Sequence, residues 1–173
     1  MKLMKILIAG SHGMIGSAVT EHLMECGYQV VRLVRHAPGP EEVWWDPDAG
    51  KIEAEDLEGF DGVIHLATMP WPMRWTAKAK QKIRSNRLTT NRLLAESLAG
   101  CVRKPGVLIC ASGMGYYPSS GEDILTEDSP AGTASSLRCR RRARQPQLPP
   151  ATRASGWCIC ASRRFWVALP CSG

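Results

Sequence analysis

The chain lacks any hydrophobic run long enough to cross a bilayer. A membrane-spanning helix needs about 20 consecutive apolar residues, whereas the first apolar run, residues 6–9, ends at a glycine. The same run is too short for the hydrophobic part of a secretory signal. We therefore expect a cytoplasmic protein that has no membrane partner.

The cysteines do not form the pattern of a disulfide framework or a metal site. There are seven of them, an odd number, and no secretory signal accompanies them, so we expect reduced thiols. Cys158 and Cys160 have only one residue between them, which is the wrong spacing for zinc, and no histidine lies nearby. We predict no metal site.

Acidic residues and lysine are absent from residue 134 onward, where eight arginines stand. Residues 1–133 hold all 16 acidic residues and 14 basic ones, so the tail accounts for the formal net charge of +6. We expect one domain over residues 1–133. Residues 134–173 form an Arg-, Pro- and Cys-rich tail for which we expect no stable structure.

The most informative motif is a glycine-rich turn between an apolar strand and a helical pattern. Glycine at position 10 permits a tight turn, glycine at 13 lets a pyrophosphate approach the backbone, and glycine at 16 permits close helix packing. Free N–H groups at the helix start would face the phosphates. The residues that we predict to bind the cofactor here are Gly10, Ser11, His12, Gly13, Met14, Ile15 and Gly16.

Strand and helix patterns alternate along residues 1–111. The predicted strands are residues 2–9, 28–34, 43–45, 61–67 and 105–111. A first helix over residues 14–26 would bury Ile15, Val19, His22, Leu23 and Cys26. A second would begin after an N-cap at Thr76 and run to Leu98, with its lysines in solvent. This order predicts an α/β, Rossmann-like doubly wound parallel sheet that stops after about five strands.

Further candidate residues stand at the predicted strand ends, where such sheets bind ligands. Arg35 follows the second strand, where an acidic residue would bind the ribose 2′-hydroxyl and an arginine suits a 2′-phosphate. Arg35 therefore favours NADP over NAD. We also place His65, Leu66 and Ala67 in the cofactor site, and Ser112 follows the fifth strand.

Residues 1–133 resemble the extended short-chain dehydrogenase/reductases, in particular the nucleoside-diphosphate-sugar epimerase-like branch. The resemblance is carried by the opening strand and turn, the arginine that ends the second strand, and the fourth strand. It also covers the helix and the segments near residues 111–117 and 125–130. It implies an NAD(P)-dependent oxidoreductase or epimerase with a carbonyl or nucleotide-sugar substrate.

The sequence departs from the family at two places. Thr68, Met69 and Pro70 stand where the branch usually has glycine and an acidic residue. No Tyr-x-x-x-Lys pair, the usual proton-transfer pair of these enzymes, occurs in the 173 residues. Ser112 matches the family serine near the substrate carbonyl, where it could donate to an oxyanion; capping the turn is an equal alternative.

The tail has the composition expected after a reading-frame slip near residues 132–134. If the codons of residues 156–162 are read one base out of phase, the genetic code allows the sequence Val-Val-His-Leu-Arg-Phe. This sequence resembles the family's sixth strand. The same shift over residues 134–138 admits Phe-Leu-Ala-Glu, similar to the expected helix start. A competing interpretation is a nucleic-acid-binding arm, but the arginines of residues 138–144 form a short cluster without aromatics.

We therefore expect a cofactor-binding part of an epimerase-like or dehydratase-like oxidoreductase that is catalytically incomplete. The alternative is a dinucleotide-binding module that senses redox state without turnover.

Overall fold

The structure of the chain is a computed structural model that describes residues 3–69, 76–111, 124 and 126. Within these residues, five parallel strands form one sheet in the order β3-β2-β1-β4-β5. The sequence therefore predicted the fold class correctly. The strands are β1 (Lys5–Ala9), β2 (Gln29–Val34), β3 (Glu42–Trp44), β4 (Gly62–His65) and β5 (Val107–Cys110).

The order of the strands places a crevice above β1 and β4. The chain adds β2 and β3 on one side of β1, then crosses to the other side for β4 and β5. At such a reversal the loops after two neighbouring strands diverge and leave space for a ligand. Ala9 and His65 are paired at this point of the sheet, so the turn after β1 and the loop after β4 border the same space.

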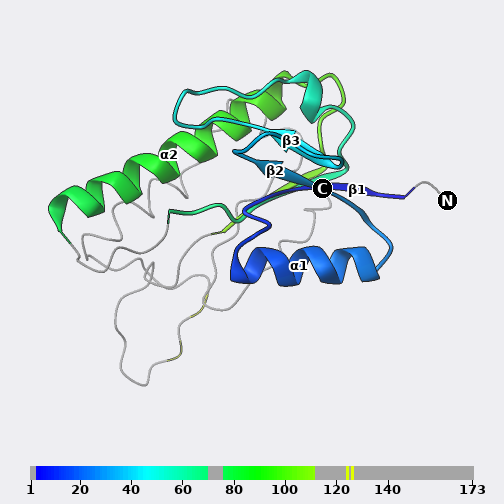
Figure 1. The fold of residues 1–173 in the computed structure, drawn as a ribbon, viewed down its shortest axis with the longest axis horizontal. Coiled ribbons are helices and arrows are strands. Elements are labelled where there is room, and N and C mark those ends of the chain that lie inside the picture. Colours follow the sequence, from blue (N-terminus) through cyan, green and yellow to red (C-terminus); the bar gives the residue numbers. More distant parts are fainter. Residues whose placement is uncertain (1–2, 70–75, 112–123, 125, 127–173) are drawn as a thin grey trace.

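Two helices cover opposite faces of the sheet (Figure 1). Helix α2 (Ala77–Gly100) packs Leu94 and Leu98 on the face that carries Leu7, Val63 and Leu108. Helix α1 (Met14–Glu25) packs on the other face. That smaller apolar cluster contains Ile6, Ile8, Val30, Val19, Leu23, Tyr28 and Ile64. A short 3-10 helix, η1 (Glu55–Leu57), lies between β3 and β4.

The buried face of α1 differs from the predicted one. Gly16 and Thr20 are the buried residues of this helix, with Val19 and Leu23 half-buried beside them. Ile15, His22 and Cys26, which the sequence pattern placed on the inner face, are exposed. The error arose because the buried positions of α1 are a glycine and a threonine, and neither contributes to a hydrophobic pattern.

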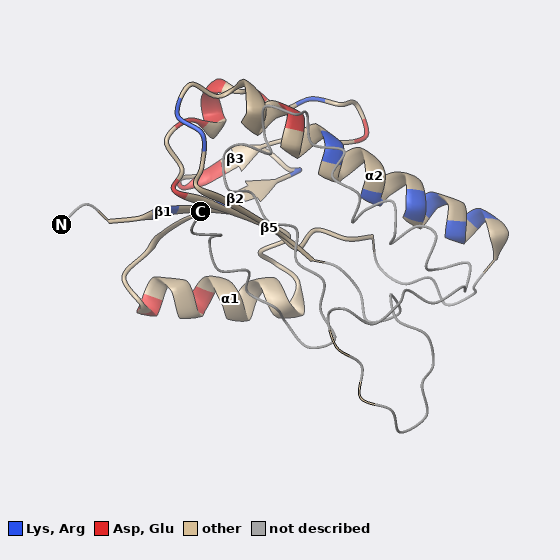
Figure 2. Ribbon diagram, turned by 180° about the vertical axis from the view of Figure 1, so that it is seen from behind, with Lys and Arg blue, Asp and Glu red and all other residues tan. Residues whose placement is uncertain are grey.

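Helix α2 agrees with its prediction. The Thr76 hydroxyl accepts a hydrogen bond of 3.1 Å from the Ala79 N–H, which makes it the N-cap. Basic residues follow one another along the first half of the helix (Figure 2), and Lys78, Lys80 and Lys82 are exposed. No helix of the described residues has the length and apolar character that a membrane span requires.

Candidate functional site

The glycine turn has the backbone geometry that its sequence predicts. Gly10 has a φ of 85°, a left-handed conformation that L side chains rarely adopt. A Cβ at Gly10 would lie 2.6 Å from the backbone nitrogen of Ala67, so the turn after β1 packs directly against the loop after β4. The two segments therefore form one continuous wall of the crevice.

Gly16 and Gly13 have different surroundings. A Cβ at Gly16 would collide with the Gly10 carbonyl oxygen and lie 2.8 Å from Ser11 Cα. Gly16 therefore lets α1 pack against the turn itself, a more local role than the helix–sheet packing predicted from the sequence. A Cβ at Gly13 would meet only the Gly10 carbonyl oxygen, at 3.4 Å, so the protein leaves open space there.

The first turn of α1 has free hydrogen-bonding capacity. Gly13 is the N-cap residue, no side chain caps the helix, and no acidic residue lies in the first turn. The first N–H groups of a helix have no partner within it, and together with the helix dipole they attract an anion. This end of α1 therefore fits a phosphate group.

A cleft of about 420 Å³ lies beside the turn. Gly10 and Gly13 line it from the turn, Leu66 and Ala67 from the loop after β4, and Arg35 from the end of β2. Three separate parts of the sequence thus meet here. The other residues predicted to bind the cofactor, namely Ser11, His12, Met14, Ile15, Gly16 and His65, are not among the residues that line this cleft. The lining also includes residues that the sequence analysis had not placed in a site, namely Asp48, Thr68, Met69, Lys82 and Asn86.

Lys82 and Asn86 were missed because their helix was interpreted as a solvated surface. They lie four residues apart, so they share one face of α2. Asp48 belongs to a turn that the Asp46 carboxylate holds by accepting hydrogen bonds from the N–H groups of Asp48 (3.0 Å) and Ala49 (3.1 Å). The sequence predicted this turn but gave no sign that it borders the cleft.

Arg35 is half-exposed and has two contacts at the rim of the cleft. Its Nη1 lies 3.5 Å from Asp48 Oδ2, and its guanidinium carbon lies 5.8 Å from the centroid of the Trp45 ring. Trp45 is buried, so it gives the guanidinium a fixed apolar support. An exposed ion pair of this length is weak, which leaves the arginine free to bind an anionic ligand.

His65 is buried behind the cleft. Its Nε2 lies 3.4 Å from the Thr90 hydroxyl, and its Nδ1 has no hydrogen-bond partner among the described residues. Burial, reinforced by the positive charges of Arg87 and Arg35, lowers the pKa of His65 to about 4. The ring is therefore neutral at pH 7. His65 supports the wall formed by Leu66 and Ala67 from behind.

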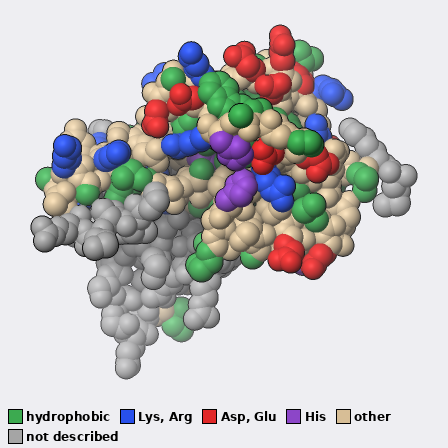
Figure 3. Space-filling model, viewed as in Figure 1, with side chains coloured by type: hydrophobic (Ala, Val, Ile, Leu, Met, Phe, Trp, Pro, Cys, Tyr) green, Lys and Arg blue, Asp and Glu red, His purple; other side chains and the backbone are tan. Residues whose placement is uncertain are grey.

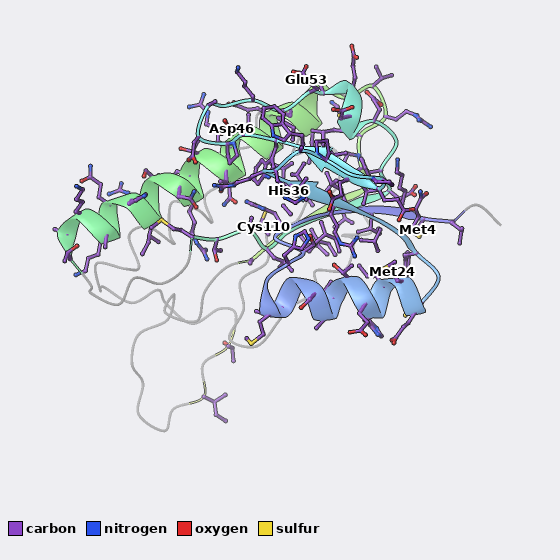
Figure 4. All side chains as sticks on the ribbon, in the orientation of Figure 1. Met4, Met24, His36, Asp46, Glu53 and Cys110 are labelled. Carbon is purple, nitrogen blue, oxygen red and sulfur yellow. The ribbon has the colours of Figure 1, made fainter. Side chains whose placement is uncertain are left out.

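The described residues supply few groups for acid–base or nucleophilic chemistry. Burial raises the pKa of the Cys110 thiol to about 12, so this side chain near the end of β5 (Figure 4) remains a protonated thiol. Ser112, the candidate oxyanion donor, lies outside the described residues. No group of three or more His, Cys, Asp or Glu side chains in the described ranges could hold a metal ion.

Comparison with known proteins finds a family model and individual relatives that match this chain. The sequence model of the NAD dependent epimerase/dehydratase family matches residues 6–170. An epimerase family protein of Mycobacterium bovis is 35% identical over 130 residues, which are 74% of this chain and 42% of that protein. The chain thus spans less than half the length of this curated relative.

Solved structures agree with this match. The nucleoside-diphosphate sugar epimerase of Corynebacterium glutamicum is 28% identical and superimposes with a TM-score of 0.78, over 92% of this chain and 34% of that one. The human epimerase family protein SDR39U1, solved with NADPH, is 26% identical with a TM-score of 0.73, over 90% of this chain and 52% of that one.

Proposed function

The chain belongs to the NAD-dependent epimerase/dehydratase family, and from this premise we propose that its cleft binds NADP in preference to NAD. The observation that carries the proposal is the uncapped N-terminus of α1, which opens beside Arg35 in one cleft. The turn and the first N–H groups of α1 would hold the pyrophosphate. Leu66 and Ala67 would bound the cofactor on the β4 side.

The preference for NADP rests on Arg35. At this position a carboxylate would accept hydrogen bonds from the ribose hydroxyls of NAD, whereas a guanidinium pairs with the 2′-phosphate of NADP. The human relative is solved with NADPH and other structural neighbours are solved with NAD, so the preference rests on Arg35 alone. When bound, the nicotinamide of the cofactor would supply hydride transfer, the chemistry expected of the family.

Direct binding tests the proposal. Isothermal titration of the 173-residue chain with NADP⁺ and with NAD⁺, at the same pH and ionic strength, should give a lower Kd for NADP⁺. Equal affinities would contradict the preference for NADP, and the absence of binding by both would contradict the cofactor site itself.

We propose further that the chain binds cofactor without completing a catalytic cycle. The 173 residues contain no Tyr-x-x-x-Lys pair, the usual proton-transfer pair of these enzymes. The substrate of an intact relative would be a carbonyl compound or a nucleotide sugar. Incubation of the chain with NADP⁺ and UDP-glucose should leave the absorbance at 340 nm unchanged, whereas steady reduction of the cofactor would contradict this part.

A dinucleotide-binding module that responds to redox state without turnover is the second candidate, and the same missing pair favours it. Such a module should distinguish NADPH from NADP⁺ by affinity. Equal Kd values for the oxidised and reduced forms would exclude a redox sensor but not a cofactor site.

For residues 134–173 we propose a shifted reading frame, because their composition changes abruptly and the shifted codons admit family-like segments. The family match nevertheless reaches residue 170, so an in-frame tail is the competing outcome. The DNA sequence across codons 130–136 decides between them: a one-base shift should restore a continuous family-like extension. If it does not, the frame slip is wrong.

A further inference from the structure

Two exposed histidines meet at the end of the sheet beside the proposed cofactor cleft. His12 belongs to the glycine turn after β1 and His36 follows β2, and their ring centroids lie 6.1 Å apart at an interplanar angle of 67°. Figure 3 shows histidine side chains side by side on this face of the molecule, and Figure 4 places His36 between α1 and α2. Neither ring is part of the core.

One of the two rings also contacts a carboxylate. His36 Nε2 lies 3.3 Å from Glu42 Oε2, and the same oxygen accepts a hydrogen bond of 2.9 Å from the Gly39 N–H. The Gly39 N–H, together with the two imidazoles, holds the pKa of Glu42 below its usual value. Glu42 is therefore ionised near neutral pH and would repel an anion unless a protonated imidazole stands between them.

The other ring keeps one nitrogen available. His12 Nδ1 lies 3.4 Å from the Ser11 hydroxyl, and its Nε2 makes no hydrogen bond to the described residues. Ser11 and His12 border a hollow that Arg32 also lines. The other charged groups near the histidine pair are Arg35 and Asp48 on the cleft side, Glu42 at the start of β3, and Arg32, Glu21 and Glu25 around the hollow that His12 borders.

We propose that His12 and His36 form the pH-dependent part of the 2′-phosphate subsite beside Arg35, so that protonation of the two imidazoles increases the preference for NADP over NAD. The inference rests on the proposed cofactor site. A cofactor whose pyrophosphate lies on the turn and whose adenosine ribose lies at the end of β2 places its 2′-phosphate near the residues that follow these two strands. His12 and His36 are such residues.

The chemistry explains why histidine differs here from a second arginine. A neutral imidazole offers one N–H donor, whereas a protonated one offers two and carries a charge. Histidine is the side chain whose charge most readily changes within the physiological pH range. Both cofactors carry the pyrophosphate, but NAD has a hydroxyl where NADP has the 2′-phosphate, so the added charge acts more strongly on NADP.

The test measures Kd for NADP⁺ and NAD⁺ at pH 6.5 and 8.5, at constant ionic strength, for the full chain. The double variant is His12→Gln/His36→Gln. The matched control is His22→Gln, because His22 is also exposed but lies on α1. The 2′-phosphate itself titrates near pH 6, but this contribution is common to all variants and cancels when they are compared at one pH.

We take the ratio of the NAD⁺ Kd to the NADP⁺ Kd for the unmodified chain and divide it by the same ratio for the double variant. This quotient should be about tenfold higher at pH 6.5 than at pH 8.5, the size expected of a hydrogen bond to a charged group. The His22→Gln control should follow the unmodified chain. An equal pH dependence in the double variant would overturn the inference while NADP⁺ binding upheld the cofactor site. If the unmodified chain binds neither cofactor, both this inference and the proposed cofactor site are wrong.

A spectroscopic measurement gives a second readout. The Cε1–H resonances of two histidines should shift on addition of 2′,5′-ADP but not of 5′-AMP, and these resonances should be absent from the spectrum of the double variant. Shifts confined to the resonance of His22 or His65 would contradict the subsite.

Discussion

The imidazole of His65 meets the indole of Trp45 edge to face, with ring centroids 5.8 Å apart and an interplanar angle of 85°. Both side chains are buried. The contact joins the end of β4 to the segment after β3, and Trp45 in turn supports Arg35. The two rims of the cleft, one formed by Leu66 and Ala67 and the other by Arg35, are therefore connected through a single packed pair.

This burial predicts a dependence of stability on pH. The pKa of His65 falls from 6.5 to about 4 on folding. Between these two values the unfolded chain binds more protons than the folded one, so the free energy of unfolding falls as the pH is lowered through this window. The loss from this residue amounts to at most about 3 kcal/mol at or below pH 4.

Urea unfolding at pH 7, 6, 5 and 4 measures this loss. The variant His65→Leu removes the titrating group, so its free energy of unfolding should fall less between pH 6.5 and 4 than that of the unmodified chain. His22→Leu, at an exposed position on α1, should retain the full dependence. Parallel curves for the unmodified chain and His65→Leu would show that His65 does not titrate differently in the folded and unfolded states.

A second prediction concerns the balance between Arg35 and Asp48. Arg35→Ala removes the cation and should weaken NADP⁺ binding about tenfold to a hundredfold, as expected for a hydrogen bond to a charged group, with little effect on NAD⁺. Asp48→Asn removes the competing carboxylate, which lies 3.5 Å from the guanidinium, and should strengthen NADP⁺ binding. Titration calorimetry gives both values.

If Arg35→Ala weakens NADP⁺ binding and Asp48→Asn strengthens it, Arg35 contacts the cofactor and is not merely a solvated surface residue. If Arg35→Ala leaves the ratio of the NAD⁺ and NADP⁺ affinities unchanged, the arginine does not select the cofactor.

The glycine turn allows a third prediction, in which two similar substitutions have different effects. Gly16→Ala forces a Cβ onto the Gly10 carbonyl and should cost about 1–3 kcal/mol of folding stability, the usual cost of an overpacked position. Gly13→Ala places its Cβ at ordinary contact distance, 3.4 Å from that carbonyl, and should leave stability nearly unchanged. It should instead weaken cofactor binding, because the methyl group occupies space proposed for the pyrophosphate.

Thermal unfolding and calorimetric titration with NADP⁺ distinguish the two effects. Equal losses of stability in the two variants would mean that the turn does not have this geometry. Undiminished NADP⁺ binding by Gly13→Ala would place the pyrophosphate elsewhere.

The sequence predicted those features that depend on local patterns. Short apolar runs, the glycine spacing and the threonine N-cap identify the strands, the turn and the start of α2, because each depends on neighbours within a few residues. Asp48, Lys82 and Asn86 escaped prediction because their place in the cleft depends on how distant segments pack. The inner face of α1 was wrong for a related reason: Gly16 is buried by contact with the turn, and glycine carries no hydrophobic signal.

The fourth prediction concerns Thr90, which connects α2 to the back of the cleft. Its hydroxyl lies 3.4 Å from His65 Nε2 and 3.4 Å from the Arg87 carbonyl oxygen, and the residue is 1% exposed. Thr90→Val should lower the free energy of unfolding by about 1–3 kcal/mol, because it removes the hydrogen-bond partner of a buried ring nitrogen. Thr20→Val is the matched control.

Thr20 is also buried, but its hydroxyl donates only to the Gly16 carbonyl of its own helix, at 2.7 Å. Its replacement leaves no side-chain nitrogen unsatisfied and should cost less. The two threonines must also differ in a double-mutant cycle: His65→Leu should reduce the cost of Thr90→Val and leave the cost of Thr20→Val unchanged. Additive losses for His65→Leu and Thr90→Val would mean that the 3.4 Å contact between these side chains contributes nothing to stability.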